Sequence, residues 1–230
     1  ESPPSSVRQI ADWFRSNFRN SDRPLGSLEI LCSGSSTYVD AGRSIPVEPA
    51  TISNVKTAVD AWADRCDRNA DNLAILYFCG HGVVSGQEQS LLLQDFGGDT
   101  NSPFSDAIAF SKFRTGMRRR KVRNQCFLLD ACRSVSEEYL KTYGSEFTGH
   151  PLIAGSLLGS LPGTNSQVFY ASELGSAAYG KKGKPSMFAE ALMGALGGLG
   201  GWEDAKGSWI VTTSRLANAI NAYSATRTYL

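Results

Sequence analysis

The sequence predicts an α/β protein of three layers, in which helices cover both faces of a central sheet. Segments with helical and strand-like patterns alternate along the 230 residues. The two most apolar segments are nearly uninterrupted by polar residues, which is typical of buried parallel strands. The length suits one domain with a substantial core, and no internal repeat is visible. We therefore expect a single domain over residues 1–230.

The composition excludes several classes of protein. Hydrophobic residues make up 41% and charged residues 20%, which is ordinary for a globular protein. The net charge of +1 gives no general reason to expect a nucleic acid or membrane partner. No segment approaches the length of a membrane span, and the start does not resemble a signal peptide. Three of the five cysteines fall in or at the end of apolar strands, as thiols in a reducing compartment do, so we expect a cytoplasmic protein.

Two helices are expected in the first third of the chain. Proline and serine at positions 3–6 mark the start of the first helix. Its apolar face has helical spacing and consists of Val7, Ile10, Ala11, Phe14 and Phe18. Residues 28–32 suggest a short strand, and residues 33–50 a surface loop. Thr51 is the expected cap of the second helix, whose apolar face consists of Ile52, Val55, Val59, Trp62 and Cys66.

The middle of the chain holds the two most apolar strands. The first begins at Leu73 and ends at His81, and a loop is expected over residues 83–89. Residues 91–93 suggest a short strand or hairpin arm. A helix is expected over residues 105–117, with its apolar positions at Ile108, Ala109 and Phe113. The second apolar strand ends at Cys132.

The last part of the chain begins with a long connection. Residues 134–166 are rich in Gly, Ser and Pro, with one helical turn expected at 137–143. A connection of this length is usually functional or disordered. Beyond it we expect a strand at 167–172, a helix at 186–196, a strand at 208–212 and a last helix. The expected face of that last helix consists of Leu216, Ile220 and Tyr223.

A thiol and an imidazole stand at the ends of the two apolar strands. Phe127, Leu128 and Leu129 lead into Asp130, Ala131 and Cys132, and His81 lies between Gly80 and Gly82, 51 residues earlier. Strands of an open α/β sheet keep their reactive groups at their carboxyl ends. A thiol at neutral pH needs a base or a lowered pKa to act as a nucleophile. We expect His81 and Cys132 to meet as base and nucleophile.

Two backbone amides are candidate oxyanion-hole donors, and non-catalytic interpretations of Cys132 and His81 remain open. The N–H groups of Gly82 and Cys132 are the natural donors for the oxyanion that forms when a carbonyl is attacked. Taken alone, Cys132 could be a buried structural thiol and His81 a loop histidine with satisfied hydrogen bonds. The sequence has only one other histidine, His150, which lies in a turn-like segment. The pairing of the two strand ends favours the catalytic interpretation.

These strand ends give the chain a family resemblance. Residues 77–82, Tyr-Phe-Cys-Gly-His-Gly, and 127–133, Phe-Leu-Leu-Asp-Ala-Cys-Arg, resemble the caspase-like cysteine peptidases, a group that includes caspases, metacaspases, paracaspases and bacterial relatives. Caspases place their histidine about 50 residues before their cysteine. Residues 169–172 and 186–192 support the likeness. The resemblance implies a caspase-like fold, His81 and Cys132 as the catalytic pair, and Gly82 as an oxyanion-hole donor.

The resemblance also implies a substrate preference. Metacaspases and paracaspases place an acid two residues before the nucleophile, and Asp130 holds that position. A carboxylate there favours Arg or Lys before the cut, although Asp130 could instead cap nearby amides. Ser172 is the second expected substrate-binding residue. The family's third acid would fall near Gly180, and the family's first strand, which commonly ends in another pocket acid, is missing. We infer that the chain is part of a longer protein.

The likeness divides the domain into three parts. Residues 1–133 correspond to the large subunit, 134–166 to the linker that many caspases cut, and 167–230 to the small subunit. Lys141 is the only cation after Ser134 within that linker. It is a candidate self-cleavage point if the enzyme is specific for basic residues, and an uncut surface loop is the alternative.

The expected partners are a protein or peptide substrate and a fused or associated sensor or regulatory module. No cofactor and no metal site is expected. The basic run at 112–123 is typical of a solvated helix end, so we do not expect nucleic acid binding. Three rival functions remain open. They are a catalytically silent interaction scaffold, another thiol hydrolase such as an amidase, and a caspase-like protease that prefers acidic residues.

Overall fold

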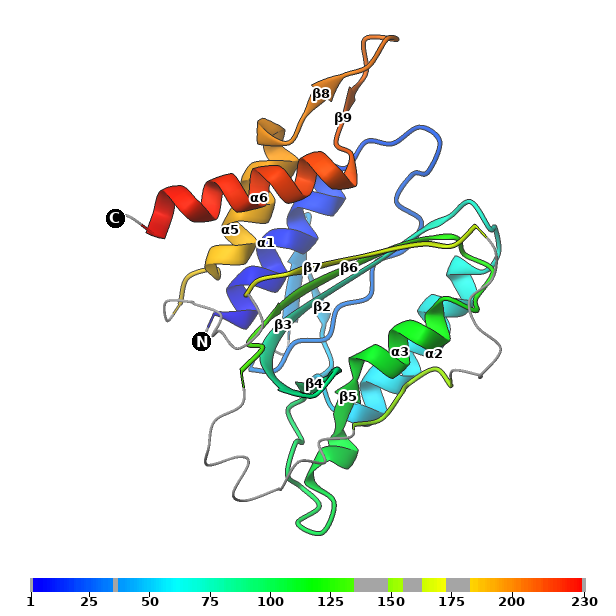
Figure 1. Ribbon diagram of the computed structural model, residues 1–230, viewed down its shortest axis with the longest axis vertical. Helices are drawn as coiled ribbons and strands as arrows, with labels where there is room; N and C mark the ends of the chain where they lie inside the picture. Colours follow the sequence, from blue (N-terminus) through cyan, green and yellow to red (C-terminus); the bar gives the residue numbers. More distant parts are fainter. Residues whose placement is uncertain (1, 35–36, 135–148, 155–162, 173–182, 229–230) are drawn as a thin grey trace.

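In the computed structural model, the described residues are 2–34, 37–134, 149–154, 163–172 and 183–228. A mixed sheet of five strands, in the order β5-β4-β3-β6-β7, forms the middle layer. Helices cover both of its faces (Figure 1). The helices α1 (Pro3–Ser16), α5 (Met187–Gly194) and α6 (Thr213–Thr228) lie on one face. The helices α2 (Ile52–Cys66) and α3 (Phe110–Met117) lie on the other.

The sheet has a parallel part and an antiparallel part. The strands β3 (Leu73–Ser85), β6 (Asn124–Ala131) and β7 (Asn165–Tyr170) are parallel to one another. The strands β4 (Glu88–Leu92) and β5 (Ala107–Ala109) add an antiparallel extension beyond β3. The expected layered α/β architecture is confirmed.

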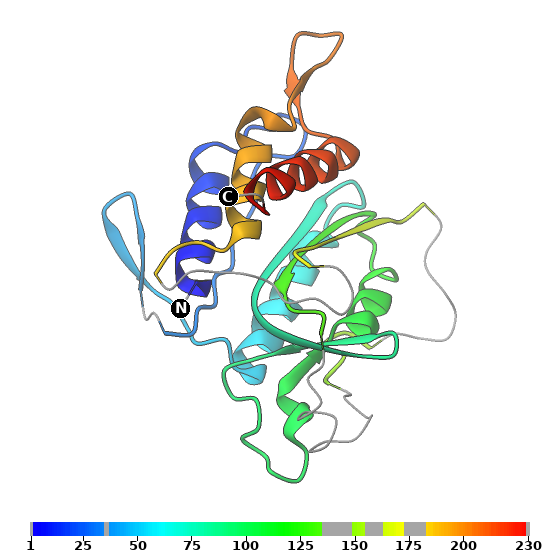
Figure 2. The ribbon, with the colours of Figure 1, turned by 60° about the vertical axis from the view of Figure 1, so that its left-hand side comes forward.

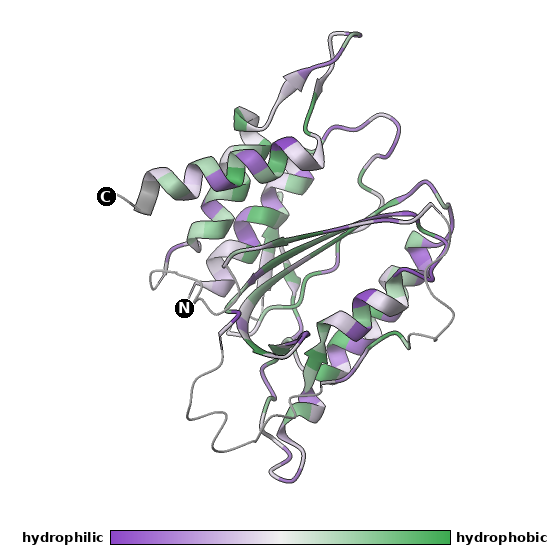
Figure 3. Ribbon diagram, viewed as in Figure 1, coloured by the Kyte–Doolittle hydropathy of each residue, from purple (hydrophilic) through white to green (hydrophobic). Residues whose placement is uncertain are grey.

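Alternate residues of β6 supply two separate cores, one on each face of the sheet. Phe127 and Leu129 pack toward α2 and α3, while Cys126 and Leu128 pack toward α1, α5 and α6. Every residue of β6 after Asn124 is buried, as expected for a strand covered by helices on both faces. Figure 3 shows the apolar residues gathered along the strands and on the helices beside them.

Two helices begin at predicted or recognisable caps. The hydroxyl of Thr51 accepts a hydrogen bond from the backbone N–H of Asn54, as expected for the start of α2. Ser186 caps α5 in the same way, through the backbone N–H of Ala189. No helix in the described ranges is both long and apolar enough to cross a membrane.

Two boundary predictions in the middle of the chain are wrong. The expected loop at 83–89 is the end of β3 and the start of β4, which form an antiparallel hairpin. The expected helix at 105–117 begins only at Phe110. A 3₁₀ turn (Pro103–Asp106) and β5 precede it. Ile108 and Ala109 lie in β5 because this segment pairs with β4, a long-range contact that outweighs the local pattern.

Three other segments also differ from expectation. Residues 28–32 form no strand, and only Leu31 makes an isolated bridge, to Glu48. The expected loop at 33–50 contains a hairpin of β1 (Thr37–Asp40) and β2 (Arg43–Pro46). Only β9 (Trp209–Ile210) forms in segment 208–212, and it pairs with β8 (Trp202–Glu203) in a separate ribbon, which projects away from the sheet (Figure 2). The turn expected at 137–143 and Lys141 lie outside the described residues.

Candidate functional site

His81 and Cys132 lie side by side at the point where the parallel pairing of β3 and β6 ends. Cys79 pairs with Asp130 and Gly80 with Ala131. The next residue along β3, which continues to Ser85, is His81, and the residue that follows the end of β6 is Cys132. His81 is exposed and Cys132 is half-buried. Both line one cavity of about 1160 Å³. The structure therefore brings together the two residues that the sequence predicts as base and nucleophile.

Gly82 lies close against Ala131 and Cys132. A Cβ atom on this residue would stand 2.7 Å from the carbonyl oxygen of Cys132 and 3.1 Å from the Cβ atom of Ala131. The first distance is shorter than a non-bonded contact with backbone allows, so any side chain here would push the two strand ends apart. Glycine at this position therefore lets the backbone of His81 and Gly82 approach Cys132.

Gln89 is a residue of this site that sequence reasoning missed. Its side chain is only 4% exposed, and its Nε2 group donates a hydrogen bond to the carbonyl oxygen of Cys132 at 3.4 Å. The hairpin of β3 and β4 brings it there, because Gln89 pairs with Val84. Gln89 thus positions the backbone that follows β6. No motif marks it, since its place depends on strand pairing.

Asp130 lines the cavity and is buried in a polar network. It is 3% exposed, and its Oδ2 atom accepts hydrogen bonds from the hydroxyl of Tyr77, at 2.7 Å, and from that of Ser186. Ser186 in turn donates its backbone N–H to the hydroxyl of Ser6 at 2.9 Å. The network links β3, β6, α1 and the start of α5, and it fixes the Asp130 carboxyl group.

Burial dominates the electrostatics of this network. It raises the pKa of the Asp130 carboxyl group, although the hydrogen bonds from Ser186, Tyr77 and Cys79 act in the opposite direction. Burial also raises the pKa of the Cys79 thiol to about 12 and that of Tyr77 well above its usual value. The Cys79 thiol is therefore protonated at neutral pH, whereas a cysteine nucleophile reacts as the thiolate.

The raised pKa of Asp130 predicts a pH-dependent stability. The folded state holds the carboxyl proton more tightly than the unfolded chain, whose value is about 3.9. The resulting stabilisation is complete below that pH and is lost as the pH rises through the folded-state pKa. We expect the free energy of unfolding of the wild type, relative to Asp130→Asn, to fall as the pH rises from about 4. Urea unfolding of both proteins across this range measures it, and a constant or growing difference would contradict it.

Ser172 and Arg133 lie near the end of β6, outside the Asp130 network. The hydroxyl of Ser172 donates a hydrogen bond to the carbonyl oxygen of Ala131 at 3.3 Å, so Ser172 lies beside the end of β6. The guanidinium of Arg133 stacks on the Tyr170 ring, 3.9 Å from its centre. Gly180 lies outside the described residues.

His150 is held away from the two strand ends. It pairs with Ile108 in an isolated bridge, and its Nδ1 atom accepts a hydrogen bond from the backbone N–H of Leu152. It does not line the cavity. His81 is therefore the histidine that stands next to Cys132. Within the described part of the chain, no three His, Cys, Asp or Glu side chains form a group suited to a metal ion.

Comparison with known proteins relates the chain to a family and to a bacterial relative. A family model described as the caspase domain matches residues 35–206. An uncharacterised protein of Sinorhizobium fredii, y4kE, is 30% identical over 231 residues. That alignment includes 93% of this chain and 66% of the relative, so the chain spans just under two thirds of the relative's length. The five-stranded sheet flanked by helices agrees with a caspase-like fold.

Proposed function

Because the chain belongs to the caspase domain family, a family of cysteine peptidases, we propose that it is an endopeptidase with Cys132 as nucleophile and His81 as general base and acid. One observation carries this proposal. His81 and Cys132 follow paired residues of β3 and β6 and line the same cavity. The presence of both groups at the place where the pairing of β3 and β6 ends favours an enzyme over a silent scaffold.

The proposed reaction has two steps, each using the same groups. His81 takes the proton of the Cys132 thiol, and the thiolate attacks the carbonyl carbon of the scissile peptide bond. The backbone N–H groups of Gly82 and Cys132 stabilise the oxyanion. His81 then gives the proton to the departing amine, which leaves a thioester on Cys132. Water, deprotonated by His81, hydrolyses the thioester and restores the thiol.

We assign the preference for the residue before the cut to Asp130. It lines the same cavity as His81 and Cys132, and a carboxylate at that place pairs with a guanidinium or ammonium group. Ser172, beside the end of β6, is proposed as a further substrate contact. The greater length of the Sinorhizobium relative supports regulation by an attached or associated module.

Profiling the chain against a peptide library tests the proposal. We expect cleavage after Arg or Lys, and none by Cys132→Ala. Cleavage after Asp would refute the role of Asp130 while leaving the peptidase intact. Hydrolysis of small amides alone would indicate an amidase. If no substrate is cut and no peptidyl electrophile labels Cys132, the interaction scaffold is the better description.

A further inference from the structure

Cys132 lies just beyond the paired part of the sheet. The pairing of β6 with β3 ends at Ala131, and its pairing with β7 ends at Leu129. Strand pairing therefore stops before the residue that the proposed reaction uses as nucleophile. A reacting group that is misplaced by about 1 Å can lose about 10²-fold in rate, so the backbone around Cys132 needs another restraint.

Two side chains bind the carbonyl groups on either side of the Cys132 Cα atom. The Ser172 hydroxyl donates to the carbonyl oxygen of Ala131 at 3.3 Å, and the Nε2 group of Gln89 donates to the carbonyl oxygen of Cys132 at 3.4 Å. Each carbonyl belongs to a planar peptide group, so each hydrogen bond restrains one whole peptide. The two donors come from opposite sides, because Ser172 follows β7 and Gln89 belongs to β4, and β6 lies between these strands.

The bond from Ser172 also directs the Cys132 N–H group. In a trans peptide the C=O and N–H groups point in opposite directions. The carbonyl of the peptide between Ala131 and Cys132 is bound on the side of β7. The N–H of Cys132 therefore points toward the side of β3, the strand that carries Gly82. Cys132 and Gly82 are the two residues whose N–H groups are proposed to stabilise the oxyanion.

Gln89 occupies a place where packing alone would favour an apolar side chain. It is 4% exposed, and the alternation of a strand puts it on the same face of β4 as Leu91, which packs in the core with Phe127. The Oε1 atom of Gln89 is buried and has no hydrogen-bond partner among the described residues. A buried amide oxygen without a donor costs free energy. Stability therefore does not explain this amide, whose Nε2 group binds Cys132.

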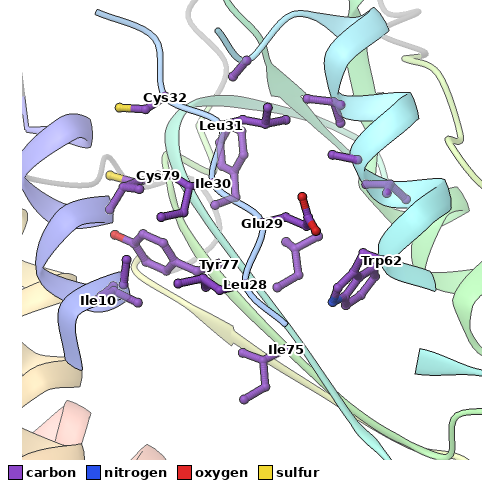
Figure 4. Close-up of a pocket in the computed structure, with 18 of the residues that line it drawn as sticks. Ile10, Leu28, Glu29, Ile30, Leu31, Cys32, Trp62, Ile75, Tyr77 and Cys79 are labelled. Atoms are coloured by element: carbon purple, nitrogen blue, oxygen red, sulfur yellow. The ribbon is translucent and has the colours of Figure 1, made fainter. Parts of the chain in front are cut away.

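The amide of Gln89 lies beside the backbone of Gly82 as well. A Cβ atom on Gly82 would stand 3.5 Å from Nε2 of Gln89 and 2.7 Å from the carbonyl oxygen of Cys132. Figure 4 shows part of the cavity lining, which includes residues of α1, α2 and β3 and residues 28–32. Neither Gln89 nor Ser172 belongs to the described lining. An effect of Gln89 on catalysis would therefore pass through Cys132.

We propose that Gln89 is a positioning residue for Cys132, and that Gln89 and Ser172 form a clamp on the two peptides that flank the nucleophile. This inference rests on the proposed peptidase function. The clamp takes over where strand pairing ends, and it holds the Cys132 Sγ atom and N–H group in a fixed relation to Gly82. It requires a hydrogen-bond donor at position 89. The lone pairs of the Ser172 hydroxyl can still accept a hydrogen bond from a substrate.

Gln89→Met tests the need for a donor, because it keeps an unbranched side chain of similar length. We expect kcat for peptide hydrolysis to fall at least about tenfold while KM changes less than about threefold, since the substrate still binds but the nucleophile is misaligned. Urea unfolding checks that the variant is folded. The matched control is Gln87→Met in the same hairpin, where the side chain is exposed, and it should change neither constant.

Gln89→Glu separates positioning from packing, because the size of the side chain is unchanged. A carboxylate cannot donate to the Cys132 carbonyl oxygen, whereas a protonated carboxyl group can. The ratio of its kcat to that of the wild type should therefore rise as the pH falls from about 8 to about 5, while the buried carboxyl group takes up its proton. Gln87→Glu should show a constant ratio.

The outcomes separate this inference from the proposed function. Full kcat in Gln89→Met, or a ratio independent of pH in Gln89→Glu, would overturn the clamp and leave the peptidase intact. If Gln89→Met does not fold, the pH dependence of Gln89→Glu decides. A wild type that hydrolyses no peptide would refute the peptidase, and the positioning role with it.

Discussion

Replacing Cys132 by alanine is expected to lower peptide hydrolysis by at least about 10⁴-fold, because no thiolate remains to attack the substrate. His81→Ala should cause a loss of similar size. Without its base, no group takes the proton of the Cys132 thiol, and the leaving amine receives no proton. The double variant should be hardly worse than either single one, since two groups that act as a unit lose their effect together. Steady-state kinetics on one peptide measures all three.

His150→Ala is the matched control for this series. It removes the only other histidine, whose Nδ1 atom is occupied by the backbone N–H of Leu152. Its hydrolysis rate should stay within a few-fold of the wild type while it remains folded. Losses from His81→Ala and Cys132→Ala that multiply in the double variant would show that the two residues do not act together. Peptide hydrolysis that survives in Cys132→Ala would refute the role of Cys132 as the nucleophile.

The sequence predicts the parts of the fold that depend on local pattern. The apolar spacing of α1 and the cap at Thr51 depend on neighbouring residues, and both are confirmed. The apolar runs that become β3 and β6 are also visible without knowledge of their partners. Their parallel pairing ends at Gly80 and Ala131, which brings His81 and Cys132 side by side. The meeting of His81 and Cys132 was therefore predictable, although the strand of His81 was expected to end there and instead continues to Ser85.

Features that depend on contacts between distant residues were not predictable. Val83 and Val84 continue β3 because they pair with Ser90 and Gln89, although glycine at position 82 suggested a loop. Residues 28–32 have the composition of a strand, yet within the described residues only Leu31 among them forms a bridge, to Glu48. Tyr77 looks like one more apolar strand residue, but its hydroxyl binds Asp130. Each of these features depends on contacts between residues far apart in the sequence, and the local sequence pattern does not indicate those contacts.

Asp130→Asn is expected to lower kcat/KM for an arginine substrate by about 30-fold to several thousand-fold. Loss of one partner of a desolvated, hydrogen-bonded charge pair costs about 2–5 kcal/mol, and each 1.36 kcal/mol is about tenfold. Substrates with a neutral residue before the cut should change far less. Asparagine has nearly the same shape, so Tyr77 and Ser186 keep an oxygen to which they can donate. A uniform loss across all peptides would show that Asp130 acts only on the structure of the site.

The raised pKa of Asp130 sharpens this expectation, because only the ionised carboxyl group attracts arginine. The preference for arginine over a neutral residue should grow as the pH rises through that pKa. The Tyr77 hydroxyl stabilises the charged form, so its removal in Tyr77→Phe should raise the pKa further and move the onset of the preference to higher pH. Asp130→Asn should show no such onset. A preference that is independent of pH in the wild type, or unmoved in Tyr77→Phe, would place the arginine-binding group elsewhere in the cavity.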